Sequence, residues 1–347
     1  MRIKEIVASC LLAVFSSAVA EEWNDCKYGI APLNRDRNAV LEFFTTNVYG
    51  ARPDMTSFKP SYKVVENVDL KTCIRRRIKI NTLTPLGETN FIATAYFPKK
   101  AGKVPVWVMP GFQTPIRQFL KAHEGAVGRW PVDYITLSNS HATVTFTNRD
   151  VLNDSADVLK GVNRAPVSWG AISTWALAAS RVVDYLETTE EADMSKIAVV
   201  GLSRLGKTAL WAGALDTRFS LVCPNCSGLF GARCATVNVG GETIDRITKV
   251  FPHWFAPVCR ERWAGKDRSL PFDQHWLLAA VSPRLLAVGS ASEDYWASPS
   301  GEFTGFFLAR NAWKDPSRCD YHLRKGKHNL TREDWQSYIQ FAQKHGW

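Results

Sequence analysis

The sequence predicts an α/β protein with a doubly wound, mostly parallel sheet whose first strands are antiparallel. Residues 62–68, 74–80 and 91–97 alternate between polar and apolar side chains, and the Pro85–Gly87 turn lies between the last two, which is typical of an antiparallel start. After residue 104, short apolar runs alternate with helical patterns, as in buried parallel strands joined by helices. These observations place an antiparallel entry before a parallel core.

The elements follow in order along the chain. An amphipathic helix is expected over 38–47, because apolar residues recur on one helical face between Val40 and Phe44. Buried strands are expected at 104–109, 142–146, 197–200, 219–223, 285–289 and 321–323, and helices at 169–186, from 208 onward, around 275–280 and over 331–345. No repeat or low-complexity linker divides these elements, so residues 21–347 should form one large domain.

The first twenty residues have the pattern of an export signal. Arg2 and Lys4 supply positive charge, residues 6–15 form a short apolar run, and Ala18–Ala20 is a small-residue cleavage site. The apolar run is too short to cross a bilayer. We therefore expect a mature protein that begins at Glu21, is secreted or periplasmic, and has no stable membrane insertion.

Charge and cysteine spacing exclude several classes of partner. The chain has a formal net charge of +10 at pH 7, which suits contact with acidic polymers. It has no compact basic tract interleaved with aromatic residues and no nucleic-acid-binding motif, so nucleic acid is not an expected partner. Cys223 and Cys226 have the spacing of a redox or zinc motif, but no second cysteine pair or histidine pair accompanies them. We expect thiols without a metal, and no cofactor.

The stretch from Lys196 to Thr208 is the centre of the predicted chemistry. A buried strand, a tight turn and a helix can lift Ser203 clear of the backbone as a nucleophile, with backbone N–H groups at the helix start placed for an oxyanion. The segment 201–208 also matches the phosphate-binding loop G-x-x-x-x-G-K-T. That second interpretation requires a strand-end aspartate for magnesium and a cytoplasmic location. No clear aspartate is present, and the export signal argues against the location.

A serine nucleophile in such a fold requires an acid and then a histidine later in the chain. Of the late histidines, His328 lies in a glycine-containing loop between a short strand and the last helix, where the base belongs. The loop after the 285–289 strand carries Glu293 and Asp294, and a carboxylate there would orient the imidazole and stabilise its charged form. The antiparallel entry followed by strand–helix alternation predicts an α/β-hydrolase fold, and the order of these groups is the one that this fold requires.

Specific motifs extend from the turn through the rest of the chain. The turn itself reads G-x-S-R-x-G-K, with the second glycine one place later than in most α/β hydrolases. Further motifs are found at 225–228, 241–243, 251–255, 270–275, 290–299, 301–303, 326–328 and 334–335. In these segments the chain resembles the glucuronoyl esterases of carbohydrate esterase family 15, most closely the bacterial members. The resemblance implies a serine esterase that hydrolyses the ester between (4-O-methyl-)glucuronic acid of glucuronoxylan and lignin alcohols, through an acyl-enzyme.

The resemblance also implies roles for individual residues. Ser203 would be the nucleophile, His328 the base and Arg204 the oxyanion group, while the sugar ring would be bound by Lys207, Glu242 and Trp296. The implied partners are glucuronoxylan and lignin–carbohydrate esters, and we expect a monomer.

One departure from the family concerns the triad acid. Many members carry a glutamate directly after the strand that follows the turn, where this chain has Cys226, and a thiol cannot replace a carboxylate beside a charged histidine. Bacterial relatives often supply the acid from the later loop, so Asp294 is assigned this role, with Glu293 in reserve. Asp273 is interpreted as a helix N-cap.

Three alternative functions remain open. Another carbohydrate esterase, removing acetyl or feruloyl groups, would use the same triad. A non-catalytic sugar-binding pseudo-hydrolase would explain the missing acid at Cys226. An NTPase rests on the phosphate-loop match alone.

Overall fold

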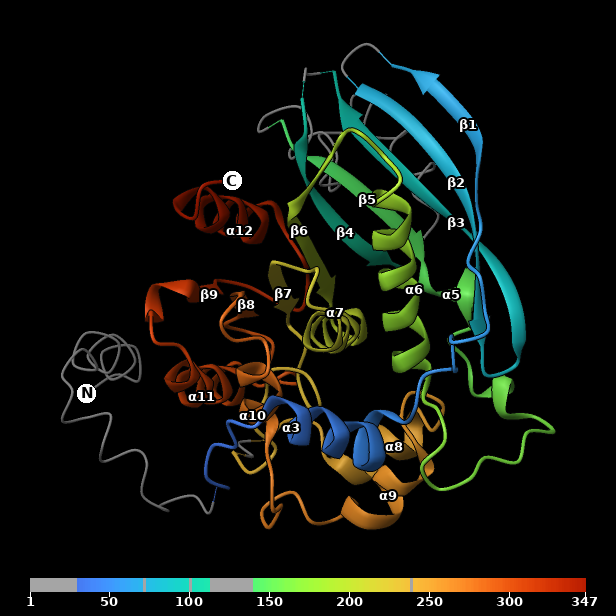
Figure 1. The fold of residues 1–347 in the computed structure, drawn as a ribbon. Helices are drawn as coiled ribbons and strands as arrows, with labels where there is room; N and C mark the ends of the chain where they lie inside the picture. Colours follow the sequence, from blue (N-terminus) through green and yellow to red (C-terminus); the bar gives the residue numbers. More distant parts are fainter. Residues whose placement is uncertain (1–29, 71–72, 100–101, 113–139, 238–239) are drawn as a thin grey trace.

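A nine-stranded mixed sheet forms the centre of the structure (Figure 1). The computed structural model describes residues 30–70, 73–99, 102–112, 140–237 and 240–347. The strand order is β1-β2-β3-β5-β4-β6-β7-β8-β9. The expected export signal over residues 1–20 and the expected first residue of the mature protein lie outside the described residues.

The antiparallel entry is confirmed. Strands β1 (Tyr62–Asp69), β2 (Cys73–Thr84) and β3 (Gly87–Pro98) pair antiparallel in sequence order. Thr84 pairs with Gly87 at the tight turn between β2 and β3, and Gly87 has a φ of 113°, which favours glycine. Strand β3 then pairs antiparallel with β5 and joins the entry to the rest of the sheet.

The remaining strands are parallel, as predicted. They are β4 (Val104–Gly111), β5 (Ala142–Thr147), β6 (Ala192–Leu202), β7 (Leu221–Asn225), β8 (Leu285–Ala291) and β9 (Cys319–Arg324). The chain moves from β4 to β5 on one side and then returns to place β6 on the other side of β4. Ligands in open α/β sheets bind where the strand order reverses, beyond the carboxyl ends of the strands. The residues that follow β5 and β6 are therefore placed at such a crevice.

Helices cover both faces of the sheet. The buried side chains of α6 (Ala171–Leu186) and α7 (Arg204–Leu215) join the main hydrophobic core, whereas those of α12 (Arg332–Lys344) form a separate core against β4, β6, β7 and β8. Figure 1 shows α12 apart from α6 and α7. The other helices are α3 (Arg37–Phe44), α5 (Asn148–Val151), α8 (Ile244–Val250), α9 (Pro257–Trp263), α10 (Gln274–Ala279) and α11 (Pro299–Ala309), with short π or 3₁₀ turns at Thr45–Tyr49, Ala156–Leu159, Arg310–Ala312 and Pro316–Arg318.

Helix α3, near the amino end, packs beside α10 from late in the chain (Figure 1). Phe43 on α3 lies 4.7 Å from the ring of Phe272 and 5.8 Å from that of Trp276 between ring centroids. The aromatic side of the expected 38–47 helix is therefore a core contact. Asp273 caps α10, as interpreted from the sequence, and accepts a hydrogen bond from the Gln274 backbone N–H.

Two boundaries differ from the predictions. The expected helix over 38–47 ends at Phe44 and continues as a π turn over Thr45–Tyr49. Helix α7 begins at Arg204, before the expected start at Thr208. Gly206 therefore lies inside the first turns of the helix and not in the turn that precedes it. In the residues with described structure, no helix combines the length and apolar character needed to span a membrane.

Candidate active site

Ser203 lies on a strained turn between β6 and α7. Its φ and ψ of 62° and −127° are disfavoured for a residue with a side chain. The backbone is held there by two hydrogen bonds, from the Ser203 N–H to the Asn225 carbonyl at 2.9 Å and from the Lys207 N–H to the Ser203 carbonyl at 3.1 Å. This geometry is typical of a nucleophile elbow.

Two glycines make the turn sterically feasible. A Cβ at Gly201 would lie 2.0 Å from the Leu205 carbonyl oxygen, and one at Gly206 would lie 2.8 Å from the Asn225 carbonyl oxygen. Real Cβ atoms do not approach oxygen so closely, so both positions require glycine. The spacing of the two glycines in the sequence motif follows from this close packing of α7 against β6 and β7.

A pocket of about 330 Å³ opens beside the elbow. It is built from residues that follow β6, β7, β8 and β9, where the carboxyl ends of the parallel strands meet. All the site residues predicted from the sequence line it except Glu293: Ser203, Arg204, Lys207, Glu242, Asp294, Trp296 and His328.

Asp294 and His328 form a close polar pair in this pocket. The His328 Nδ1 atom lies 2.6 Å from Asp294 Oδ2, and the Asp294 side chain is 4% exposed. Burial alone would raise the pKa of Asp294, but the hydrogen bond and charge of His328 hold that pKa below its ordinary value. Glu293 is exposed and lies outside the pocket lining. The structure thus places Asp294, and not Glu293, against the histidine.

Cys226 occupies the position directly after β7 and contacts the same pair. Its thiol forms a hydrogen bond with Asp294, and its Sγ lies 3.7 Å from the Asn329 carbonyl oxygen. Burial raises the pKa of the Cys226 thiol, with the nearby charges of Glu302 and Asp294 acting in the same direction. The thiol is therefore neutral and cannot balance the charge of an imidazolium.

Ligand atoms of Cys226, Asp294 and His328 lie within 4.8 Å of one another. Thiolate, carboxylate and imidazole are ligands that zinc accepts. Here, however, the carboxylate and the imidazole are engaged in their mutual 2.6 Å hydrogen bond, and the thiol is held in its protonated form. The group is arranged as a histidine–acid pair with a neutral neighbour.

Lys207 reaches the pocket from the first turns of α7. It is 4% exposed, and its Nζ donates a hydrogen bond to the Ser227 carbonyl oxygen at 2.5 Å. Burial lowers the pKa of Lys207 to about 8, although the charges of Glu242 and Glu302 oppose the shift. The ammonium group is thus a buried donor, and part of its hydrogen-bonding capacity is used by the protein.

Glu302 is a buried acid behind Lys207 that the sequence analysis did not assign to the site. Its carboxylate accepts hydrogen bonds from the Gly228 N–H at 2.8 Å and from the hydroxyls of Ser227 and Ser290 at 3.2 and 2.5 Å. Burial raises the pKa of Glu302 to about 7. The acid fixes the Ser227–Gly228 backbone whose carbonyl oxygen holds Lys207.

Glu242 and Trp296 also line the pocket. The Trp296 indole forms a hydrogen bond with the Glu242 carboxylate, and the Glu242 N–H donates to the Trp296 carbonyl oxygen at 3.3 Å. Burial raises the pKa of Glu242, while the charge of Lys207 opposes this change. Trp296 is 46% exposed, and the Arg246 guanidinium lies 4.7 Å from its ring centroid. An exposed indole edge beside a buried carboxylate suits the apolar face and the hydroxyls of a sugar ring.

Arg204 is the first residue of α7, so its backbone N–H has no acceptor within the helix. Its guanidinium lies over the Trp254 ring at 4.6 Å and the Phe251 ring at 5.4 Å, between the guanidinium carbon and the ring centroids. Its Nη1 donates to Asp154 Oδ2 at 2.7 Å. Both the backbone and the side chain of Arg204 are therefore available at the pocket wall beside Ser203.

A family model described as glucuronyl esterase of fungi matches residues 126–315, more than half of the chain. The chain belongs to the glucuronyl esterase family.

The curated relatives include a prokaryotic protein and fungal 4-O-methyl-glucuronoyl methylesterases, such as one from Sodiomyces alcalophilus that is 30% identical over 194 residues, 52% of this chain and 39% of that protein. Carbohydrate esterase MZ0003, from an unknown prokaryotic organism, is 44% identical over 196 residues, which are 51% of this chain and 45% of that protein. The chain spans about half the length of the curated relatives that it matches.

Two solved structures resemble the fold over almost the whole chain. A promiscuous CE15 esterase from a marine bacterial metagenome has a TM-score of 0.79 and 31% identity, and the match covers 89% of this chain and 91% of that one. A glucuronoyl esterase from Solibacter usitatus has a TM-score of 0.78 and 28% identity, with 90% and 92% covered. The α/β-hydrolase fold predicted from the sequence is confirmed.

Within the glucuronyl esterase fold, the phosphate-loop interpretation of segment 201–208 is not favoured. Lys207, which would contact phosphate, is instead buried beside Glu242 and Glu302 and donates to a backbone carbonyl. Acidic neighbours would repel a nucleotide phosphate.

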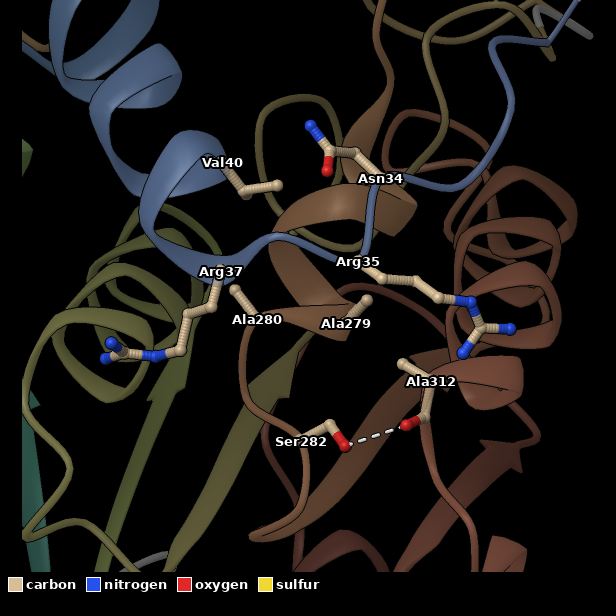
Figure 2. Close-up of a pocket in the computed structure, with 8 residues that line it drawn as sticks. All are labelled: Asn34, Arg35, Arg37, Val40, Ala279, Ala280, Ser282 and Ala312. Atoms are coloured by element: carbon tan, nitrogen blue, oxygen red, sulfur yellow. Dashed lines mark hydrogen bonds between the residues drawn. The ribbon is translucent and has the colours of Figure 1, made fainter.

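A second cavity, of about 110 Å³, lies between the start of α3 and the end of α10 (Figure 2). Figure 2 shows the guanidinium groups of Arg35 and Arg37 directed to opposite sides. They donate to the carbonyl oxygens of Asn311 at 2.7 Å and Ala214 at 2.6 Å. Both cations thus donate hydrogen bonds to backbone carbonyl oxygens of the surrounding segments.

The sequence analysis missed Asp154, Glu302 and the aromatic pair Phe251 and Trp254. The aromatic pair and Glu302 each had a signal, because the segments 251–255 and 301–303 were among the recognised motifs. Asp154 lies far in sequence from every predicted site residue and in none of the recognised motifs, so no local pattern marks it as a neighbour of the pocket residue Arg204.

Proposed function

We propose that the chain is a serine esterase that hydrolyses the ester between the carboxyl group of (4-O-methyl-)glucuronic acid on glucuronoxylan and an alcohol of lignin. The observation that carries the proposal is the convergence of Ser203 with the hydrogen-bonded His328–Asp294 pair in one pocket. Family membership supports the reaction class. The enzyme would act outside the cytoplasm, as the export signal in the sequence indicates.

In the proposed reaction, Ser203 Oγ attacks the ester carbonyl while His328 accepts the hydroxyl proton. Asp294 holds the imidazole in the required tautomer and stabilises its charge. The oxyanion of the tetrahedral intermediate is stabilised by the Arg204 backbone N–H and guanidinium. His328 then returns the proton to the departing alcohol, and the uronoyl group remains esterified to Ser203 until water, activated by His328, releases it.

Recognition of the uronate depends on its ring, because the carboxyl group of the ester carries no charge. Lys207 and Glu242 supply a donor and an acceptor for the hydroxyl groups or the 4-O-methyl oxygen, and Trp296 packs against the ring. Buried polar groups of this kind discriminate strongly against substrates that leave them unpaired.

We expect benzyl glucuronate to be hydrolysed with a kcat/KM at least about 100-fold higher than that for acetylated xylo-oligosaccharides. The ring of the uronate pairs with Lys207 and Glu242 while its carbonyl is attacked, whereas an acetyl ester presents no ring on the acyl side. The measurement is initial rates for both substrates on one preparation. Equal values or a preference for the acetyl ester would favour another carbohydrate esterase, and no turnover of either would favour a sugar-binding pseudo-hydrolase.

A pH dependence of binding follows from Lys207. Since burial lowers its pKa to about 8, the ammonium is charged below pH 8 and loses its proton above it, which weakens a hydrogen bond to the ring. We expect KM for benzyl glucuronate to rise by about 3- to 10-fold between pH 7 and pH 9.5. A small activated acetate ester, which has no uronate ring, serves as the control on the same enzyme, and its KM should show no such rise. A KM for benzyl glucuronate that stays flat over this range would remove Lys207 from ring recognition.

A further inference from the structure

Asp154 is a buried acid that the proposed reaction does not use. It lies in the loop between α5 and the Ala156–Leu159 turn, beyond the carboxyl end of β5, and its side chain is 1% exposed. Burial alone would raise its pKa, but hydrogen bonds from His253, Trp254 and Arg204 and the charge of Arg204 hold the pKa well below its ordinary range. The group is therefore an ionised carboxylate enclosed by the protein.

Both oxygens of this carboxylate accept hydrogen bonds. Oδ2 accepts from Arg204 Nη1 at 2.7 Å, and Oδ1 accepts from Trp254 Nε1 at 2.8 Å and lies 3.0 Å from His253 Nε2. The indole N–H and the guanidinium can only donate hydrogen bonds, so both terminal atoms of the residue 154 side chain must be acceptors. A carboxylate meets this requirement, and an amide does not.

The partners of Oδ1 are themselves anchored. The His253 and Trp254 carbonyl oxygens accept hydrogen bonds from the first two N–H groups of α6, those of Ala171 at 2.7 Å and Ile172 at 3.3 Å. Gly170 packs so closely against this segment that a Cβ there would lie 2.3 Å from the Trp254 carbonyl oxygen. Asp154 thus links Arg204 to a segment that is fixed on the helix layer.

Two aromatic rings restrict the orientation of the Arg204 guanidinium. The Phe251 and Trp254 rings are stacked 3.7 Å apart and nearly parallel, and the Arg204 guanidinium lies over both. Stacking sets the plane of the guanidinium but permits rotation within that plane. The hydrogen bond to Asp154 removes this rotation, because it engages one terminal nitrogen from one direction.

We propose that Asp154 is a positioning residue that orients the Arg204 guanidinium toward the oxyanion formed at Ser203. The inference rests on the proposed esterase function. Asp154 directs one edge of the guanidinium away from the reacting carbonyl and leaves the rest of the group at the pocket wall, where the arginine side chain is 27% exposed. Donors aimed in advance at a developing negative charge need no reorganisation during the reaction.

The test is Asp154→Asn, assayed for kcat and KM with benzyl glucuronate. An asparagine must present its NH₂ group either to the Arg204 guanidinium or to the Trp254 indole, and both of these are donors. We expect kcat to fall by about 10- to 100-fold, with KM changed by less than about 3-fold, because the ring-binding side chains are untouched. A kcat within about 2-fold of the wild-type value would overturn the proposal.

Asp216→Asn is the matched control. Asp216 also accepts a hydrogen bond from an arginine, Arg218 at 2.7 Å, its side chain is 11% exposed, and it lies outside the pocket lining. Both variants should lower Tm, but only Asp154→Asn should lower kcat. An equal loss of kcat in the two variants would mean that the effect comes from general destabilisation, and the proposal would be wrong.

A double-mutant cycle identifies the residue through which Asp154 acts. On an Arg204→Ala background, Asp154→Asn should reduce kcat by less than about 3-fold further, because there is no guanidinium left to misplace. Additive losses would contradict the proposal.

If Asp154→Asn does not fold, the proposal is tested with Arg204→Lys instead, since lysine keeps a cation beside Asp154 but has no second terminal nitrogen. Its kcat should fall by about 10-fold or more, and full activity would overturn the proposal.

Failure of the esterase proposal would be visible separately. In that case the wild-type protein itself would not hydrolyse benzyl glucuronate, or would do so without Ser203. With wild-type turnover established, the Asp154 variants test only the positioning of Arg204.

Discussion

Replacement of Ser203 by alanine is expected to reduce kcat for benzyl glucuronate by about 10⁴-fold or more, because the members of a catalytic triad act as a unit and the loss of one forfeits most of the rate. Alanine adopts the φ of 62° about as poorly as serine does, and the elbow is held by backbone hydrogen bonds that remain. The fold should therefore be retained. The measurements are kcat with benzyl glucuronate as the substrate and Tm by thermal unfolding.

His328→Ala is the companion variant and should lose activity to a similar degree. Its imidazole is 42% exposed, so its removal leaves no large cavity in the core. Near-wild-type turnover in a well-folded Ser203→Ala protein would mean that the nucleophile lies elsewhere. Activity that survives in His328→Ala alone would mean that a different base acts on Ser203.

Asp294→Asn is expected to reduce kcat by about 10³- to 10⁴-fold. The present carboxylate accepts a 2.6 Å hydrogen bond from His328 Nδ1, and it also accepts one from the Ala297 N–H at 3.3 Å. An amide at this position favours the wrong imidazole tautomer and does not stabilise the imidazolium. The loss should appear mainly in kcat, because Asp294 does not bind the ring.

The neighbouring acid is the matched control for Asp294. Glu293 is exposed and does not line the pocket, so Glu293→Gln should leave kcat within about 2-fold of the wild-type value. If Glu293→Gln were the crippling change, the two acids would have to exchange roles.

A carboxylate restored after β7 offers a rescue experiment. Because the Cys226 thiol lies beside the acid and the histidine, we expect Cys226→Glu to recover part of the kcat lost in Asp294→Asn. Rescue by Cys226→Ser would contradict this interpretation, because a hydroxyl supplies no charge.

The antiparallel entry and the parallel core of the sheet could be predicted because each local pattern agreed with the global fold. The Pro85–Gly87 turn between two alternating segments specifies a hairpin, and β4 to β8 read as apolar runs because both of their faces are buried. The start of α7 could not be placed, since Gly206 is unfavourable in helices by propensity. Glycine is required at position 206 for a tertiary reason, because a Cβ there would lie too close to the Asn225 carbonyl oxygen.

For the pocket, the sequence by itself predicted Ser203 and His328, because a glycine-flanked turn after a buried strand and a late loop histidine each occupy a fixed place in this fold; the structure places both in one pocket. The resemblance favoured Asp294 as the acid and kept the adjacent Glu293 in reserve. Only the tertiary structure decided which one contacts His328, because adjacent residues in a loop point in directions set by the backbone around them. Asp154 depended on tertiary structure entirely: it is fifty residues from Arg204 in sequence, and its function depends on hydrogen-bond donors that converge from β6–α7 and the 251–255 segment.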